Sequence, residues 1–581
     1  MPQQIHLPLI SAWLRTCEQG HGAHCIDASL RSPAKLQNLR VIDVKLKCIV
    51  NAPADCKYIA LSYVWGRSNR LQLKHDTYDS MHSSGFFGKQ EVPATIGDAM
   101  LVVEGCGERF LWVDAVCIIQ DDANDRTLQL SQLGAVYQNA SFTIVATCSD
   151  HANAGLSGVR TGTRKVEQNC INLGQFGIMS LMNDWGPGVN NSTWQQRAWT
   201  LQEGVFSGRG LFFTSKQIHW RCSKAHWCEE TERETTIFHD LGRSENRWGR
   251  YGELQVALSP TTLLVDPQFF NRLLSVYTFR RLTFEGDALN AIAGISRAMT
   301  EHTGVHFSWG LPQQEFSLAL AWSLGNRGPM LIRNQDYRRN QAIHQVRLQS
   351  ETVVNVPFPT WSWAGWKMGY YVSWNRERTY SKNSISLNEL HPEITFYHYE
   401  EDGRLGRISE YTANGKRSYF VNRLNILDQY SESRVRWMQF PNTIEALRQL
   451  NIGDLIVNPV YLSQLVFWTS CARIILQVLL ESPSPNFTQD DDVLKYEESG
   501  EQILLKGFYY EPETGTGSLE PGRSQVVRDF IIIGRSFAQP DWLDGLIVQW
   551  MNGIASRVGH GNVSERNWIA SKRVWKLVTL V

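Results

Sequence analysis

Short apolar runs that end in polar or ionisable residues recur in the first 230 residues of the chain. The segments Ile59–Tyr63, Phe110–Cys117 and Phe142–Ala146 are each long enough for one buried strand. Apolar residues at helical spacing over 96–103 and 125–139 predict helices between these strands, the first with Thr95 as its cap. Strands that alternate with helices are typical of a mainly parallel, doubly wound sheet, whose ligands bind beyond the carboxyl ends of the strands.

The pattern changes outside this region. Alternating segments over 40–50 predict two edge strands, the stretch 260–300 favours helices, and short β-like runs begin at Pro359. The most apolar span, Val460–Leu480, contains polar residues that would be costly in lipid, and we interpret it as a buried helix. We therefore expect an α/β domain with a mainly parallel sheet and flanking helices over 51–230, preceded by an N-terminal segment over 1–50. An α+β C-terminal region follows over 231–581.

Composition narrows the range of partners and compartments. The chain has 581 residues, with 57 Lys and Arg against 57 Asp and Glu. This balance argues against an extended positive electrostatic potential that would attract nucleic acid or an anionic membrane. We therefore expect neither as a partner. The start, Met1–Gln4, lacks a secretory signal, and the 11 cysteines are an odd number. Both features favour reduced thiols and a cytoplasmic location.

Three sequence blocks carry a resemblance to a known family. They read Tyr-x-Ala-Leu-Ser-Tyr-x-Trp-Gly at 58–66, Leu-Trp-Val-Asp-x-x-Cys-Ile-x-Gln at 111–120 and Arg-x-Trp-Thr-x-Gln-Glu at 197–203. Together and in this order they resemble the fungal heterokaryon incompatibility (HET) family. The resemblance implies a cytosolic fungal protein of nonself recognition and programmed cell death, with a fold similar to TIR domains. Some TIR domains cleave the nicotinamide–ribose bond of NAD with a helical glutamate, and Glu203 is the matching position in this chain.

Glu203 and Asp114 are the candidate catalytic residues. NAD cleavage releases neutral nicotinamide, so one carboxylate that stabilises an oxocarbenium-like transition state suffices. The alternative for Glu203 is a structural ion pair with Arg197 or Arg209. Asp114 ends an apolar strand, where it either binds a ribose hydroxyl or orients a neighbouring loop.

The candidate NAD-binding residues lie in the same three blocks. In this hypothesis NAD is a substrate and not a bound cofactor. The aromatic residues of the set either stack on a base or the nicotinamide ring of NAD, or pack in the hydrophobic core. The chain has no Gly-rich phosphate fingerprint, which disfavours a Rossmann dehydrogenase or a P-loop enzyme. The set comprises Ser62, Tyr63, Trp65, Arg197 and Trp199.

Cysteine patterns suggest two further kinds of chemistry. Cys117 is either a nucleophile or, as we favour, a buried structural thiol. The series Cys17-x3-His21-x3-Cys25 resembles a metal-ligand cluster, and Cys222, His226 and Cys228 add potential ligands. Neither group has a paired Cys-x-x-Cys knuckle, so we favour packing and assign no metal ligand. The Trp361–Trp366 block either forms an aromatic ligand-binding surface on a strand or, as we favour, packs in the hydrophobic core.

The sequence thus predicts a cell-death effector that acts through self-association or an incompatibility partner, and through NAD cleavage. The first alternative is a non-enzymatic signalling and assembly module. The second is a HET scaffold recruited for another small-molecule reaction in specialised metabolism. The surroundings of Glu203 discriminate between them: a cleft shared with Tyr63, Trp65 and Asp114 favours the enzyme, and burial in an arginine pair disfavours it.

Overall fold

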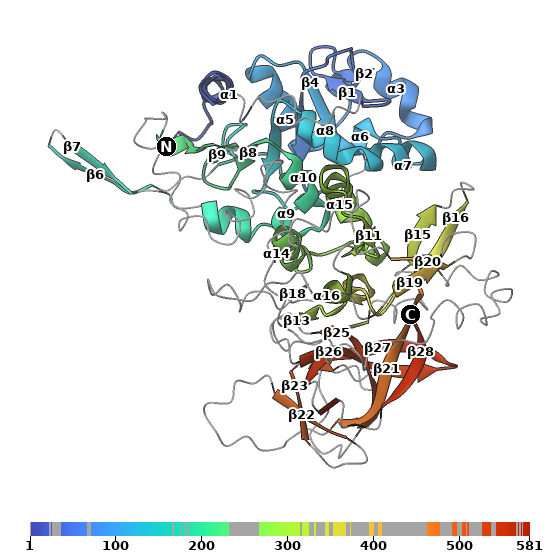
Figure 1. Cartoon of the computed structure of the whole chain (residues 1–581). Helices are drawn as coiled ribbons and strands as arrows, with labels where there is room; N and C mark the ends of the chain where they lie inside the picture. The colour runs from blue at the N-terminus through green and yellow to red at the C-terminus, as the bar shows by residue number, and fades with distance from the viewer. Residues whose placement is uncertain are drawn as a thin grey trace. The chain divides into compact units, whose positions relative to one another are not determined.

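The computed structural model of the chain forms two compact units, which are described separately (Figure 1). Unit 1 comprises Met1–Phe269 and Ala291–Ile295, and unit 2 comprises Phe270–Asn290 and Ser296–Val581. Among the described residues, every helix is too short or too polar to cross a lipid bilayer. The described residues are 2–21, 25, 36–66, 71–164, 168–174, 176–180, 182, 185–222, 224–231, 267–313, 316–324, 331–332, 343–347, 352–367, 372–373, 394, 396–399, 405–408, 462–476, 491–496, 502–506, 508–509, 526–535, 542–564, 567–568, 571 and 573–581.

Unit 1 is built around a sheet whose eight described strands run in the order β10-β9-β8-β5-β3-β4-β1-β2. The central strands β8, β5, β3 and β4 are parallel, which confirms the prediction of a mainly parallel central sheet. The flanking strands add antiparallel pairs at both sides. The strands are β1 (Arg40–Asp43), β2 (Cys48–Asn51), β3 (Tyr58–Ser62), β4 (Phe110–Val113), β5 (Thr143–Ala146), β8 (Arg209–Phe213), β9 (Ile218–Cys222) and β10 (His226–Cys228); a separate hairpin joins β6 (Cys170–Leu173) and β7 (Phe176–Met179).

The order of the parallel strands creates a topological switch point. The chain moves from β3 to β4 on one side and then crosses back to β5 on the other side of β3. Because crossovers are right-handed, connections in opposite directions place their helices on opposite faces of the sheet. The arrangement has the order of a flavodoxin-like sheet, in which ligands bind at the carboxyl edge where the order reverses. In unit 1 that edge is the end of β3 beside β5.

The helices and one strand of unit 1 differ from the sequence prediction in three details. The helix predicted over 125–139 is two helices that break at Gln132, and Asp122 caps the first of them. Thr95 is not a helix cap, because α5 begins one residue earlier and the Thr95 hydroxyl accepts a hydrogen bond from Gly155. The strand predicted to reach Cys117 ends at Val113. The helices are α1 (Leu7–Gly20), α3 (Tyr78–His82), α4 (Phe86–Lys89), α5 (Ala94–Gly105), α6 (Asp114–Cys117), α7 (Ala123–Ser131), α8 (Leu133–Asn139), α9 (Thr193–Gln196) and α10 (Trp199–Phe206).

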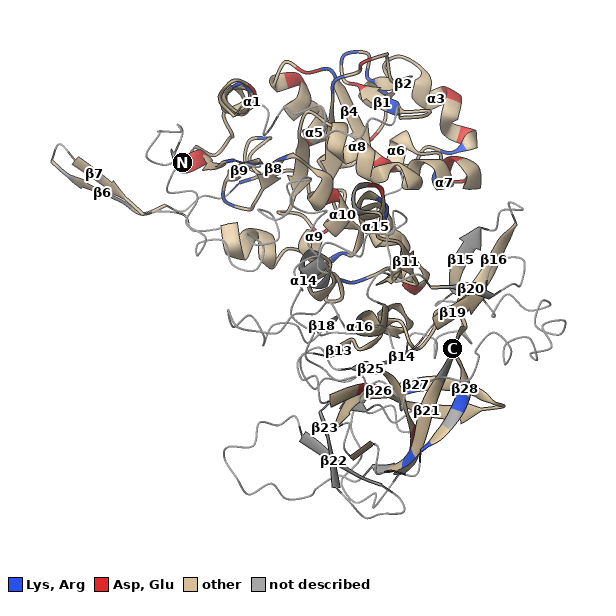
Figure 2. Ribbon diagram, viewed as in Figure 1, with Lys and Arg blue, Asp and Glu red and all other residues tan. Residues whose placement is uncertain are grey.

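Three neighbouring strands of the sheet in unit 1 are buried along their whole length. Every residue of β3, β5 and β8 is buried, which explains why their sequences are continuous apolar runs without alternation. Charged residues lie around this core, and Figure 2 shows acidic and basic residues intermixed on α7 and the β1–β2 hairpin. This distribution matches the equal numbers of the two kinds of charge in the sequence.

In the described part of unit 2 there are helices and a sheet of ten strands, in agreement with the α+β expectation. Its described helices include α16 (Phe316–Leu320) and most of α14 (Pro267–Tyr277) and α15 (Asn290–Thr303), from which Pro267–Phe269 and Ala291–Ile295 are assigned to unit 1. The large sheet contains β19 (Phe396–Tyr399), β20 (Leu405–Arg407), β21 (Leu465–Leu476), β22 (Asp491–Tyr496), β23 (Gln502–Lys506), β24 (Phe508–Tyr509), β25 (Val526–Arg535), β26 (Trp542–Met551), β27 (Ile554–Ser564) and β28 (Val574–Leu580). Four short two-stranded ladders lie among the described residues of unit 2. They pair β11 (Phe307–Ser308) with β12 (Leu311–Pro312), β13 (Ser323–Leu324) with β18 (Val372–Ser373), β14 (Leu331–Ile332) with β17 (Trp366–Lys367), and β15 (Ile343–Arg347) with β16 (Val353–Pro357).

Two sequence predictions for unit 2 are wrong. The span Val460–Leu480 is not a buried helix, because Leu465–Leu476 is the long strand β21, which pairs with β19, β22, β25 and β28. The Trp361–Trp366 block is not a strand, because a 3₁₀ turn occupies Trp363–Gly365. Its tryptophans are nevertheless buried, and each indole donates to a backbone carbonyl, as the core role requires.

Candidate functional site

Three polar side chains from separate segments meet at the carboxyl edge of the parallel sheet. Ser62 is the last residue of β3, and Glu203 lies in the middle of α10. The Ser62 hydroxyl donates to Oε2 of Glu203, and the indole of Trp194 donates to Ser62 Oγ at 2.6 Å. This relay of hydrogen bonds holds one carboxylate oxygen of Glu203 at the switch point of the sheet. Glu203 is 8% exposed, and Ser62 is 1% exposed.

Asp114 follows β4 and forms the neighbouring part of the site. Its two carboxylate oxygens accept from the indole nitrogen of Trp65 at 2.9 and 3.0 Å. The backbone N–H of Ala115 donates to Oδ1 at 2.7 Å, and Gln120 donates to the Asp114 carbonyl at 2.9 Å. These contacts fix the carboxylate at the first residue of α6. They also place Trp65 edge-on to Asp114, an interaction that the sequence did not predict.

The Trp65 loop depends on the glycine that follows it. Gly66 has a φ of +66°, and a Cβ at this position would lie 2.5 Å from Cβ of His151. Ala152 donates its N–H to the Trp65 carbonyl at 3.1 Å, which holds the turn against the loop after β5. The positive φ favours glycine at this position, and the close approach of His151 leaves no room for a side chain.

The two carboxylates influence each other. Burial raises the pKa of Asp114 from 3.8 to about 7, and the negative charge of Glu203 contributes to this rise, against the lowering effects of Trp65, Ala115 and Arg197. Burial followed by the charges of Glu203 and Asp114 also raises the pKa of Tyr137 well above 10.0. Like charges in one buried site resist simultaneous ionisation. The site therefore changes its charge near neutral pH.

This titration predicts a pH-dependent stability. Because the folded-state pKa of Asp114 is raised, the folded protein binds more protons than the unfolded chain between pH 3.8 and about pH 7. The resulting stabilisation is lost as pH rises through this window. Between pH 6 and pH 8, the wild-type unfolding free energy is expected to fall by about 1–2 kcal/mol more than that of Asp114→Asn. Hydrogen exchange of the β3 and β4 amides measures this difference, and parallel pH curves for the two proteins would contradict it.

The remaining predicted NAD-binding residues have different environments. Arg197 follows α9, is half-buried, and lies close enough to Asp114 for its positive charge to lower the pKa of that carboxyl. Tyr63 is buried in the main core, and Trp199 is half-buried and packs against that core. The surroundings of both aromatic rings suit packing in the hydrophobic core.

Arg209 and Cys117 have structural partners. Arg209 lies at the beginning of β8 and donates to Cys17 Sγ and to the carbonyls of Ser141 and Cys25. Cys117 is fully buried, its sulfur accepts from the backbone N–H of Val113, and burial raises its pKa to about 12. A thiol with this pKa is a poor nucleophile, as the structural interpretation of Cys117 requires.

Two residues of the site are not evident from the sequence pattern. Trp194 precedes the third block, and its indole organises Ser62. Tyr137 lies on α8 beside the two carboxylates and donates to the Leu61 carbonyl at 3.3 Å. The signal that could reveal Trp194 is its place nine residues before Glu203, next to an intact motif. For Tyr137 no local pattern distinguishes it from a core aromatic residue.

The fold and site define an α/β protein with a carboxylate pair at the carboxyl edge of a parallel sheet. Residues 58–203 match the family model described as heterokaryon incompatibility protein (HET), so this part of the chain supports that family assignment. The matched segment begins at the first residue of β3 and ends at Glu203, and it contains Ser62, Asp114 and Trp194. No curated protein and no solved structure matched the chain, and the similarity to TIR domains stays a prediction.

Proposed function

We propose that the chain is a fungal nonself-recognition protein whose first unit hydrolyses the bond between nicotinamide and ribose in NAD. The HET match supports the heterokaryon incompatibility role. The observation that supports the chemistry is that Glu203 and Ser62 meet at the switch point of the sheet, and that Asp114 lies at the end of the adjacent strand β4. In α/β proteins of this topology, that position is where ligands bind.

The proposed reaction needs one ionised carboxylate and one water molecule. The C1′–N bond breaks, nicotinamide leaves as a neutral molecule with the bonding electron pair, and C1′ becomes an oxocarbenium-like centre. The negative charge of Glu203 stabilises this centre. Water then adds to C1′ and loses a proton, which gives ADP-ribose, nicotinamide and one proton. Ser62 acts as a positioning residue, because its hydroxyl holds Oε2 of Glu203.

Asp114 is assigned to the ribose. With a pKa of about 7, its carboxyl group can either donate to or accept from a ribose hydroxyl near neutral pH. Arg197 contributes a positive charge that acts on Asp114, and such a charge suits the diphosphate of NAD. The half-buried ring of Trp65 is the aromatic surface assigned to the ligand.

The burial of Glu203 also fits a non-enzymatic signalling module, in which the Ser62 hydrogen bond only stabilises the fold. Inducible expression of the full chain in a fungal host separates the two functions. We expect cellular NAD to fall before growth stops, and Glu203→Gln to abolish both effects at equal protein level. Growth arrest without loss of NAD, retained in the variant, would favour the signalling module.

A further inference from the structure

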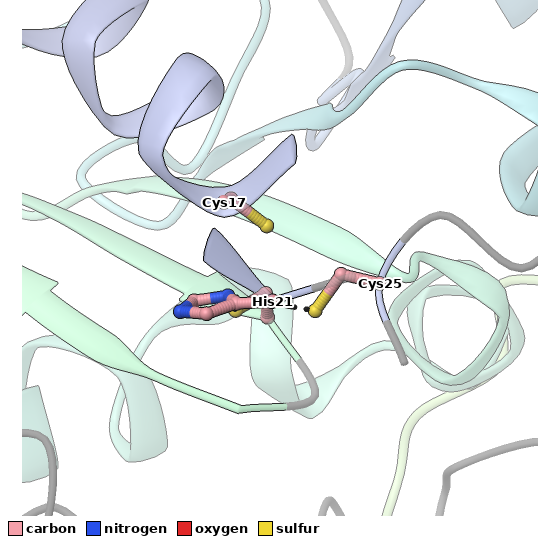
Figure 3. Close-up of side chains that lie close together, drawn as sticks. Cys17, His21 and Cys25 are labelled. Carbon is pink, nitrogen blue, oxygen red and sulfur yellow. Dashed lines mark hydrogen bonds between the residues drawn. The ribbon is translucent and has the colours of Figure 1, made fainter. Parts of the chain in front are cut away.

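Four side chains with metal-binding atoms converge from the two ends of unit 1. Cys17 lies in the last turn of α1, His21 caps that helix, and Cys25 follows at the same spacing. Cys222, the last residue of β9, joins them from about two hundred residues further along the chain. Figure 3 shows the side chains of Cys17, His21 and Cys25 close together at the end of α1. The ligand atoms of all four residues lie within 4.8 Å of one another.

The separations fit a tetrahedral zinc site. With Zn–S bonds of about 2.3 Å and Zn–N bonds of about 2.0 Å, ligand atoms at the corners of a tetrahedron are separated by about 3.5–3.8 Å. Nδ1 of His21 lies 3.6 Å from Sγ of Cys25 and 3.4 Å from Sγ of Cys222. Cys17, Cys25 and Cys222 form no disulfide, so their sulfurs remain available as metal ligands.

Local structure explains why these residues meet. In a helix, residues four apart lie on one face, so Cys17 and His21 are neighbours. In β9, side chains alternate between the faces of the sheet, and Cys222 therefore shares the face of Trp220. Trp220 stacks on Trp227, whose ring lies 5.6 Å from that of His21.

The same alternation separates the other potential ligands of this hairpin. His226 pairs with Arg221 and Cys228 pairs with His219, so both belong to the opposite face from Cys222. The ring of His226 packs against Trp185, and the Cys228 sulfur lies 3.9 Å from Glu230. Of the three potential ligands noted there in the sequence, only Cys222 joins the cluster.

Hydrogen-bond donors surround the sulfur atoms. Nε of Arg209 donates to Cys17 Sγ at 3.3 Å, and the N–H of Ala225 donates to Cys222 Sγ at 3.3 Å. Arg209 also donates to the Cys25 carbonyl at 2.7 Å. Donors directed at sulfur orient metal-ligating cysteines. Cys17 is fully buried and His21 is 7% exposed, so the cluster is largely shielded from water.

We propose that Cys17, His21, Cys25 and Cys222 bind one zinc ion that fastens helix α1 to the end of β9. Three sulfurs and one imidazole form a closed set of four ligands, which is typical of structural and not of catalytic zinc. All four residues lie outside the segment that matches the HET family model. The zinc site does not depend on the proposed NAD hydrolysis, and it extends the folded core to the N-terminal helix.

Elemental analysis of the full chain tests the zinc site. The protein is produced in zinc-supplemented medium, purified under reducing conditions without chelator, and analysed by mass spectrometry for zinc, iron and copper. We expect about one zinc ion per chain in the wild type, and less than about one fifth of that in Cys222→Ser. Cys228→Ser is the matched control, because it removes a thiol from the opposite face of the same hairpin, and it should retain the ion.

A measurement on the wild type avoids dependence on the folding of a variant. A mercurial reagent that modifies thiols should release the zinc, which a colorimetric chelator then detects in step with the loss of three protected cysteines. Peptide mapping should show that Cys17, Cys25 and Cys222 are protected until zinc leaves. Absence of stoichiometric zinc, iron in its place, a disulfide among these cysteines, or retention of zinc by Cys222→Ser would each overturn the proposal.

Discussion

Replacement of Glu203 by glutamine is expected to lower kcat for NAD hydrolysis by about a thousandfold or more. The substitution keeps the size of the side chain, and its amide oxygen can still accept the hydrogen bond of Ser62. It removes the negative charge that stabilises the oxocarbenium-like centre. The expected loss therefore falls on kcat, whereas KM for NAD changes little.

The control for this variant is a second glutamate of the same unit. Glu230 is half-buried and accepts the backbone N–H of Met182 at 2.8 Å, outside the carboxyl edge of β3. Glu230→Gln is expected to leave kcat unchanged. Steady-state release of nicotinamide, measured at equal concentrations of folded protein, compares the three proteins. Equal kcat in wild type and Glu203→Gln would remove Glu203 from the mechanism.

Replacement of Glu229 by alanine is expected to destabilise unit 1 by about 3–5 kcal/mol. Arg164 and Glu229 form a bidentate ion pair. The distance from Nη1 to Oε2 is 2.5 Å and that from Nη2 to Oε1 is 3.0 Å, and the two side chains are 0% and 4% exposed. Glu229 also accepts the N–H of Ile218, and Arg164 donates to the Pro2 carbonyl. Without the carboxylate, a buried guanidinium loses its counter-charge, and that loss dominates the expected cost.

A double replacement separates lost charge from lost packing. In Arg164→Met combined with Glu229→Leu, both charges are absent and apolar side chains fill the space. This protein is expected to be more stable than Glu229→Ala, because no uncompensated charge is buried. Denaturant dependence of hydrogen exchange in the β9 amides gives both values. A double variant that is less stable than the single one would contradict the electrostatic explanation.

The sequence predicted the carboxyl edge of the sheet but not its internal contacts. Buried parallel strands are recognisable as short apolar runs, and the ends of such strands must meet, so the proximity of Ser62 and Asp114 followed from topology. The relay from Trp194 through Ser62 to Glu203 depends on how α9 and α10 dock on the sheet. No periodicity in the sequence encodes that docking.

The wrong predictions have physical causes of the same kind. The apolar span that forms β21 has no strict alternation, and such runs do not distinguish a buried strand from a buried helix. Its pairing with β25 and β28, which lie far along the chain, decides the outcome. Likewise, the metal-ligand pattern at Cys17, His21 and Cys25 is incomplete in the local sequence, because its fourth member, Cys222, comes from a distant strand.

Incubation of the purified full chain with NAD is the most direct test of the proposed hydrolysis. Chromatography of the reaction over time measures NAD, nicotinamide and ADP-ribose in one sample. We expect NAD to disappear and the two products to form in equal amounts, with no cofactor added. Unchanged NAD in the presence of folded protein would contradict the proposed hydrolysis and leave the carboxylate pair with a structural role.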